Sequence, residues 1–117
     1  MDNKKFNSLV DELRTASIDT LAAKNAKYAG CVDDALHNFR TGAAFTGDTL
    51  ARTCWGYMAK HLVALRDMVI TNQFDNRDDF LEKCQDTVNY ICILWAIGNE
   101  QREIMGMARA WEEGAEK

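Results

Sequence analysis

Residues 81–97 read LEKCQDTVNYICILWAI, and this stretch decides the fold. Its apolar residues recur every three or four positions, the spacing of one face of an α-helix, at Leu81, Cys84, Val88, Ile91 and Trp95. From residue 91 to residue 97 every side chain is apolar, and a helix that is apolar on all sides is normally buried. The stretch therefore predicts a long helix at the centre of the domain, beginning near residues 76–78.

The rest of the chain also has the pattern of helices. It contains no proline and no alternating β-branched run, which favours helices over strands. A helix over about residues 4–28 would carry one stripe, made of Phe6, Val10, Leu13, Ser17, Leu21, Lys24 and Tyr28. A short helix is expected around residues 34–44. A longer one should run from an Asp48 cap to about Thr71, with a core face of Leu50, Cys54, Trp55, Met58, Leu62, Leu65 and Val69. The sequence predicts an all-α fold, a compact bundle of about four to five helices.

The C-terminal segment, residues 100–117, is charged but also carries Ile104, Met105, Met107 and Trp111. Gly98 and Asn99 before it indicate a break, so a further C-terminal helix is expected. Its apolar side chains are too many for a free tail. We therefore expect a single domain over residues 1–117, with a core bundle over 1–99 and a helix over 100–117. Association into a homo-oligomer is expected through this tail or the long helix.

Charge and hydropathy exclude several classes of partner. The chain of 117 residues has a formal net charge of −4 and a pI of about 5.1, whereas nucleic-acid binding requires clustered Lys and Arg. The longest apolar run, residues 91–97, is too short to span a bilayer. No apolar run follows the N-terminal lysines, so no signal peptide is expected. These features predict a cytoplasmic protein that binds neither nucleic acid nor membrane.

The four cysteines, at positions 31, 54, 84 and 92, form no C-x-x-C pair. In a reducing compartment we expect free thiols. Cys54, Cys84 and Cys92 fall on helical stretches, where the main interpretation is a small buried apolar side chain. A zinc site or a reactive thiol is the alternative.

Three polar side chains share one face of the long helix, and this helix is the one expected at the centre of the domain. Glu82, Asp86 and Asn89 are spaced i, i+4, i+7, and Ile93 continues their face. Two carboxylates one turn apart can hold Mg²⁺ through oxygen ligands. An ordinary solvated face is the alternative, which the nearby Lys83 supports.

Two lysines and one histidine also interrupt apolar patterns. Lys24 lies on the core stripe of the first helix, so it must reach solvent, pair with Glu82 or Asp86, or meet a ligand. Lys60 lies on the second face of its helix, where a surface position is the main interpretation. His61 falls on the apolar side and is expected to be a core histidine.

Four segments, taken in order, resemble the motifs of the nucleotide-modification-associated domain family of small phage proteins. Residues 24–28, KNAKY, resemble its K-x-x-D-Y element, and residues 33–40, DDALHNFR, resemble its D-x-x-x-N-F element. Residues 57–62, YMAKHL, resemble its R-M-x-D-K-x-x-R-L helix, and residues 82–90, EKCQDTVNY, resemble its D-x-x-x-D-L-x-N-Y helix. The similarity spans about residues 21–97. The family is similar in turn to the MazG-like all-α nucleotide pyrophosphohydrolases, which use Mg²⁺ held by helix carboxylates.

The resemblance implies a helical bundle, a nucleotide ligand and a phage source. Its motifs, together with the misplaced polar groups, give the candidate ligand-binding residues: Lys24, Tyr28, Asn38, Phe39, Arg40, Lys60, Glu82, Asp86 and Asn89. Two departures from the motifs remove carboxylates, since Lys27 and Ala59 stand where the family has Asp. Glu82 and Asp86 remain as candidate metal ligands, whereas Lys24, Lys27, Arg40 and Lys60 are available to neutralise phosphates.

Three functions remain open on this sequence. The departures favour a nucleotide-binding protein without turnover, which requires no cofactor. In a phage, such a protein would sequester a nucleotide or a nucleotide-derived immune signal of the host. The alternatives are a Mg²⁺-dependent nucleotide pyrophosphohydrolase and a helical interaction protein whose polar residues are structural.

Overall fold

The chain folds into four helices and, over the described residues, no strand. The computed structural model describes residues 1–29 and 33–115, but not the side chains of residues 25, 26, 28, 29 and 115. The helices are α1 (Asn3–Ala29), α2 (His37–Thr46), α3 (Leu50–Thr71) and α4 (Arg77–Ala115). The prediction of an all-α fold of about four helices is confirmed.

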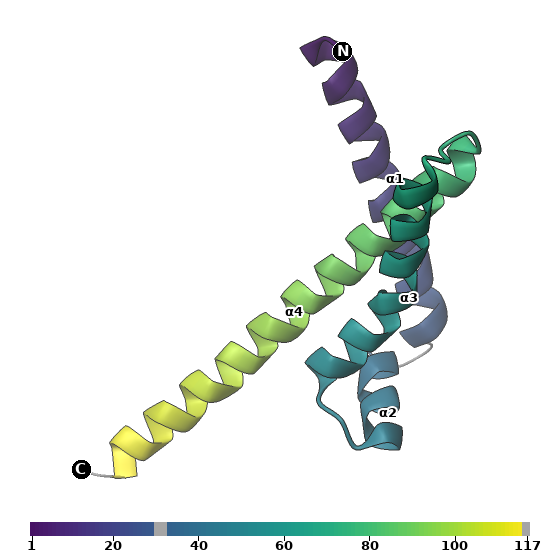
Figure 1. The fold of residues 1–117 in the computed structure, drawn as a ribbon. Helices are drawn as coiled ribbons and strands as arrows, with labels where there is room; N and C mark the ends of the chain where they lie inside the picture. Colours follow the sequence, from purple (N-terminus) through teal and green to yellow (C-terminus); the bar gives the residue numbers. More distant parts are fainter. Residues whose placement is uncertain (30–32, 116–117) are drawn as a thin grey trace.

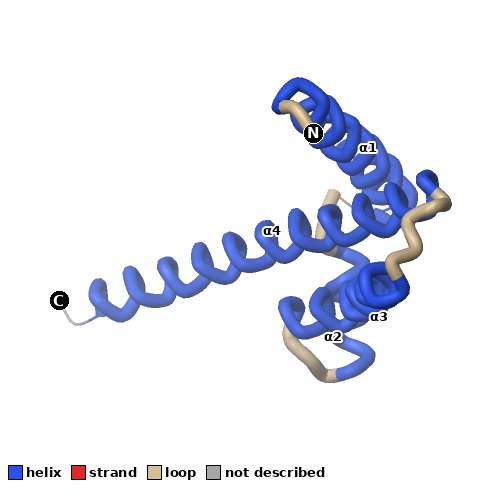
Figure 2. The backbone as a smooth tube through the Cα atoms, turned by 45° about the horizontal axis from the view of Figure 1, so that its top comes forward, coloured by secondary structure: helices blue, strands red, loops and turns tan. Residues whose placement is uncertain are grey.

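Helix α4 is the axis on which α1 and α3 pack. Helices α1 and α3 both lie against its N-terminal half, and α2 packs on α1 and α3 (Figure 1). The N-terminal half of α1 and the C-terminal half of α4 project from this packed region in different directions (Figures 1 and 2). None of the helices in the described parts of the chain has a long enough apolar stretch to cross a membrane.

The hydrophobic core is small and lies where α2, α3 and α4 meet. Its buried members are Leu36, Phe39, Cys54 and Ile97, and the partly buried Leu50, Ala51, Tyr90, Ile93 and Leu94 pack against them. Gly42 allows α2 to approach α3 closely, because a Cβ at this position would collide with the Tyr57 hydroxyl. This packing explains why position 42 is a glycine although it lies inside a helix.

Helix α4 presents Asp86 and Asn89 of its polar stripe to the core and part of its apolar stripe to solvent. Asp86 and Asn89 are only 6% and 4% exposed, whereas Ile91 is 51% and Trp95 72% exposed. The expectation that Trp95 belongs to the core is therefore wrong. The same holds on α3, where Trp55 is 56% exposed while Cys54 is fully buried. Of the predicted buried cysteines, Cys92 is exposed.

The helix ends correct two further expectations. Thr49, rather than Asp48, caps α3, because its side chain accepts a hydrogen bond from the Arg52 backbone N–H at 3.1 Å. Asn72 ends α3 in the left-handed conformation, directly after the expected helix end at Thr71. Gly98 and Asn99 do not break the last helix, since α4 continues through them to residue 115.

Arg40 joins α2 to α4. Its guanidinium donates to both carboxylate oxygens of Glu100, at 2.7 and 2.5 Å, and its Nε donates to Asp34 at 2.7 Å. The hydrogen bonds to Glu100 and Asp34 raise the pKa of Arg40, and Arg40 lowers the pKa of both carboxyl groups. The network fixes the loop before α2 against the long helix.

The described fold exposes far more surface than a compact monomer does. The accessible area is 8932 Å², compared with about 6,400 Å² expected for a compact chain of this mass. The radius of gyration is 18.3 Å, compared with about 13 Å for a compact domain of similar length. Much of the excess accessible area is apolar. Four large apolar side chains are more than half exposed: Phe6, Ile104, Met107 and Trp111.

We expect Arg40→Ala to lower the free energy of unfolding by about 1 kcal/mol, the upper end for exposed ion pairs, because it removes a bidentate contact. Arg52→Ala is the control, since Arg52 is 3.9 Å from Asp48 and largely exposed. Urea denaturation measures both variants. Equal losses for the two would show that the Arg40 network does not fix α2 against α4.

Candidate functional site

A cavity of about 470 Å³ opens between α1, α2 and α4. Its walls are mainly apolar, with Leu21 from α1, Leu36 and Phe39 from the α2 region, and Ile93 from α4. Ligand pockets of proteins fall in this size range and combine apolar walls with a few polar groups. Here the polar groups are Lys24, Asn38, Asp86, Asn89 and Tyr90.

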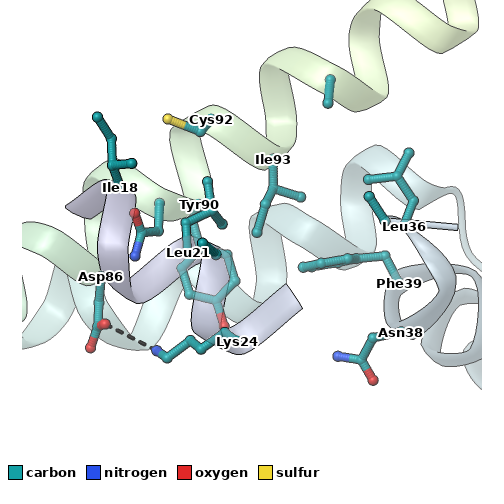
Figure 3. Close-up of a pocket in the computed structure, with 14 residues that line it drawn as sticks. Ile18, Leu21, Lys24, Leu36, Asn38, Phe39, Asp86, Tyr90, Cys92 and Ile93 are labelled. Atoms are coloured by element: carbon teal, nitrogen blue, oxygen red, sulfur yellow. Dashed lines mark hydrogen bonds and ion pairs between the residues drawn. The ribbon is translucent and has the colours of Figure 1, made fainter. Parts of the chain in front are cut away.

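An ion pair closes one side of the cavity. Lys24 Nζ donates to Asp86 Oδ1 at 3.1 Å, and Figure 3 shows Lys24 of α1 reaching across to Asp86 of α4. The Asp86 side chain is 8% exposed and the Lys24 side chain 47% exposed. A buried carboxylate needs a partner, so the lysine on the apolar stripe of α1 is explained. An ammonium group carries three donors, and Asp86 leaves the others open to the cavity mouth.

His61 of α3 lies behind the ion pair. Its Nδ1 is 3.7 Å from Asp86 Oδ2, and its ring lies against the ring of Tyr90 with centroids 5.1 Å apart. Burial lowers the pKa of His61, although the Asp86 carboxylate opposes part of this effect. Both oxygens of Asp86 thus face a basic side chain, one from α1 and one from α3.

Asn89, one turn after Asp86, lines the same cavity with an unsatisfied carboxamide. The residue is 4% exposed. Neither Oδ1 nor Nδ2 has a hydrogen-bond partner among the residues that the structure describes. Buried polar groups are nearly always paired in folded proteins, so this carboxamide is an exception that requires an explanation.

Several predicted site residues come together at this cavity. Lys24, Asn38, Phe39, Asp86 and Asn89 all line it, although they come from three separate segments of the sequence. In Figure 3, Phe39 approaches from the side opposite the ion pair, and Asn38 lies at the edge.

Other predicted residues lie elsewhere. Arg40 is held by Asp34 and Glu100, outside the cavity. Lys60 and Glu82 are exposed and do not line it. The side chain of Tyr28 lies outside the described residues, as does Cys31.

The sequence pattern did not indicate two contributors to the site. The apolar wall from Ile18, Leu21 and Ala22 reads as ordinary core, and no pattern marks it as a binding surface. His61 was expected in the core. The one signal for a site was its position directly after Lys60, in the segment 57–62 that resembles a family motif.

Within residues 1–29 and 33–115, no three His, Cys, Asp or Glu side chains are grouped so that they could hold a metal ion. Cys54, Cys84 and Cys92 are free thiols, as expected. Burial raises the pKa of the Cys54 and Cys84 thiols, which makes them less reactive.

Comparison of the chain with protein-family models, with curated proteins and with solved structures gives no match.

The environment of His61 predicts a pH dependence of stability. Because its pKa is lower in the folded protein, the unfolded chain takes up a proton first, and stability is lost as the pH falls through the ordinary histidine value of about 6.5. We expect a slope of at most about 1.4 kcal/mol per pH unit from this group. Between about pH 5 and 8, the free energy of unfolding, measured by urea denaturation, should change less steeply with pH in His61→Gln. An unchanged slope would contradict the burial of His61 in its neutral form.

Proposed function

We propose that this chain binds a nucleotide, or a small molecule derived from one, in the cavity between α1, α2 and α4, and does not cleave it. The observation that carries the proposal is the Lys24–Asp86 pair at the edge of a mainly apolar cavity of about 470 Å³. A nucleotide has a flat base with apolar faces, and an anionic phosphate. The cavity offers an apolar wall for the first and an ammonium group for the second.

Lys24 supports the proposal through its donors. It is half exposed, and its ion pair with Asp86 uses one N–H group, so further N–H groups can reach an incoming phosphate. Phe39 supports it through its ring, which is buried at the other side of the cavity, where a base can pack against it. Asn38 at the edge adds a neutral polar group.

Asp86 supports binding rather than metal-dependent cleavage. Its Oδ1 is already paired with the Lys24 ammonium, which balances its charge inside the protein, and its Oδ2 faces His61. Glu82, the other candidate Mg²⁺ ligand, does not line the cavity. A binder of this kind in a phage would sequester a nucleotide or a nucleotide-derived immune signal of the host, without turnover.

We also propose that the chain functions as a homo-oligomer. The excess accessible area of about 2,500 Å² exceeds the roughly 800 Å² that each partner buries in a standard interface. Ile97, Ile104 and Trp111 recur at seven-residue intervals on α4, and only Ile97 is buried. An antiparallel pair of α4 helices, centred between Met107 and Ala108, would place Ile104 of one copy against Trp111 of the other. One apolar stripe can therefore serve both sides of a twofold interface, which supports a second copy as the partner.

Nucleotide binding is tested with isothermal titration calorimetry, using uridine and adenosine monophosphates and triphosphates. We expect Asp86→Asn to bind at least as tightly as the unmodified chain, because Lys24 is released from its competing anion. The double variant Lys24→Met/Asp86→Asn should lose about 1.5–3 kcal/mol of binding free energy, the range for a hydrogen bond to a charged group. The double variant avoids leaving Asp86 buried without its lysine. Lys60→Met is the control and should bind normally.

Binding should persist in a chelator, and the nucleotide should be recovered intact from denatured protein. Absence of binding to every nucleotide, or full binding by the double variant, would refute the proposal. Magnesium-dependent release of phosphate or pyrophosphate, lost in Glu82→Gln, would establish the pyrophosphohydrolase alternative instead.

The oligomer is tested by light scattering on the eluting protein. We expect a mass at least twice the 13.2 kDa of one chain, and a monomer for Ile104→Glu/Trp111→Glu, because charges on the stripe oppose its burial. Arg102→Glu changes the net charge by the same amount on the same helix and should keep the assembly. A monomeric mass for the unmodified chain would refute the interface.

A further inference from the structure

The Asn89 carboxamide is the least satisfied polar group of the site. It lines the cavity, is 4% exposed, and has no hydrogen-bond partner for either polar atom among the described residues. Burying an amide without its hydrogen bonds costs stability, and an apolar side chain of similar shape avoids this cost. A group that is kept at such a cost is typical of function rather than of packing.

Neighbouring polar residues of α4 show that the helix itself can satisfy such groups. Asn99 donates from Nδ2 to the backbone carbonyl of Trp95 at 2.8 Å, and Thr87 donates to the carbonyl of Lys83 at 2.9 Å. Asp86, on the same face as Asn89, faces Lys24 and His61. Asn89 makes neither kind of contact, so its donor and its acceptor are both unused within the described residues. Each of the two atoms has less than 1 Å² of accessible surface, so a molecule in the cavity would pair with them once the side chains around Asn89 move apart.

The chemistry of a carboxamide defines the group that it can receive. It presents an acceptor oxygen beside an N–H donor, so it pairs with a planar edge that offers a donor beside an acceptor. Nucleobases have such edges, and asparagine forms this bidentate contact with adenine. The apolar side chains of Leu21, Phe39 and Ile93 line the cavity that would hold the faces of the ring.

We propose that Asn89 is the residue that recognises the base, by a two-point hydrogen bond to its polar edge. The proposal rests on the nucleotide-binding function proposed above, and it adds that the ligand must carry a heterocyclic base. A sugar phosphate alone would reach Lys24 but would leave the Asn89 carboxamide unpaired.

The test combines a stability measurement with a binding measurement on Asn89→Leu, a nearly isosteric variant. Without ligand, we expect this variant to unfold at a higher temperature than the unmodified chain, because it removes two unsatisfied buried atoms. With uridine or adenosine monophosphate as the probe, we expect at least about a tenfold loss of affinity. Ribose 5-phosphate, which lacks a base, should bind the variant and the unmodified chain equally and weakly. Asn99→Leu is the matched control, and its nucleotide affinity should be normal.

The outcomes separate this inference from the function on which it rests. If the unmodified chain binds nucleotides and Asn89→Leu binds them equally well, base recognition by Asn89 is refuted and nucleotide binding stands. If the unmodified chain binds no nucleotide, the proposed function itself is refuted. A lower unfolding temperature for Asn89→Leu would show that the carboxamide has a structural partner, and that result too would overturn the inference.

Discussion

The ion pair between Lys24 of α1 and Asp86 of α4 is the interaction on which the rest of the site depends. Asp86 is buried on the inner face of α4 and must be neutralised, and Lys24 meets it at 3.1 Å while staying half exposed. The pair joins the first helix to the last across most of the sequence, and the cavity lies between these two helices and α2. The same contact therefore holds α1 in place and leaves donors at the cavity mouth.

Placing this charge inside the fold has a consequence for the outer surface. The inner face of α4 carries Asp86 and Asn89, so apolar residues of the same helix, including Ile91 and Trp95, are left exposed. Helix α4 then extends beyond the core with a further apolar stripe through Ile104 and Trp111. The buried polar residues and the exposed apolar residues of α4 are both explained if the cavity receives a ligand and a second copy covers the exposed faces.

The helices could be predicted from the sequence because hydrophobic periodicity acts locally. The sequence also indicated a pairing of Lys24 with Glu82 or Asp86, since a lysine on an apolar stripe needs a partner, a ligand or a path to solvent. The orientation of α4 could not be predicted, because it carries an apolar stripe and a polar stripe and only tertiary contacts decide which faces inward. The continuous path through Gly98 was also missed, since one glycine lowers helix propensity but does not end a helix. Arg40 was expected to reach a ligand, and its partner Glu100 lies too far along the chain for any local pattern to indicate.

A ligand that enters this cavity is expected to pair with the Asn89 carboxamide beside the Lys24–Asp86 pair. Nuclear magnetic resonance of the ¹⁵N-labelled chain tests it most directly, because side-chain NH₂ groups give resolved signals that an Asn89→Leu variant can assign. On titration with uridine or adenosine monophosphate, the Asn89 NH₂ signals should shift and exchange more slowly with water, together with the backbone signals of Lys24 and Phe39. Shifts confined to residues outside the cavity, with the Asn89 signals unchanged at saturation, would contradict the account.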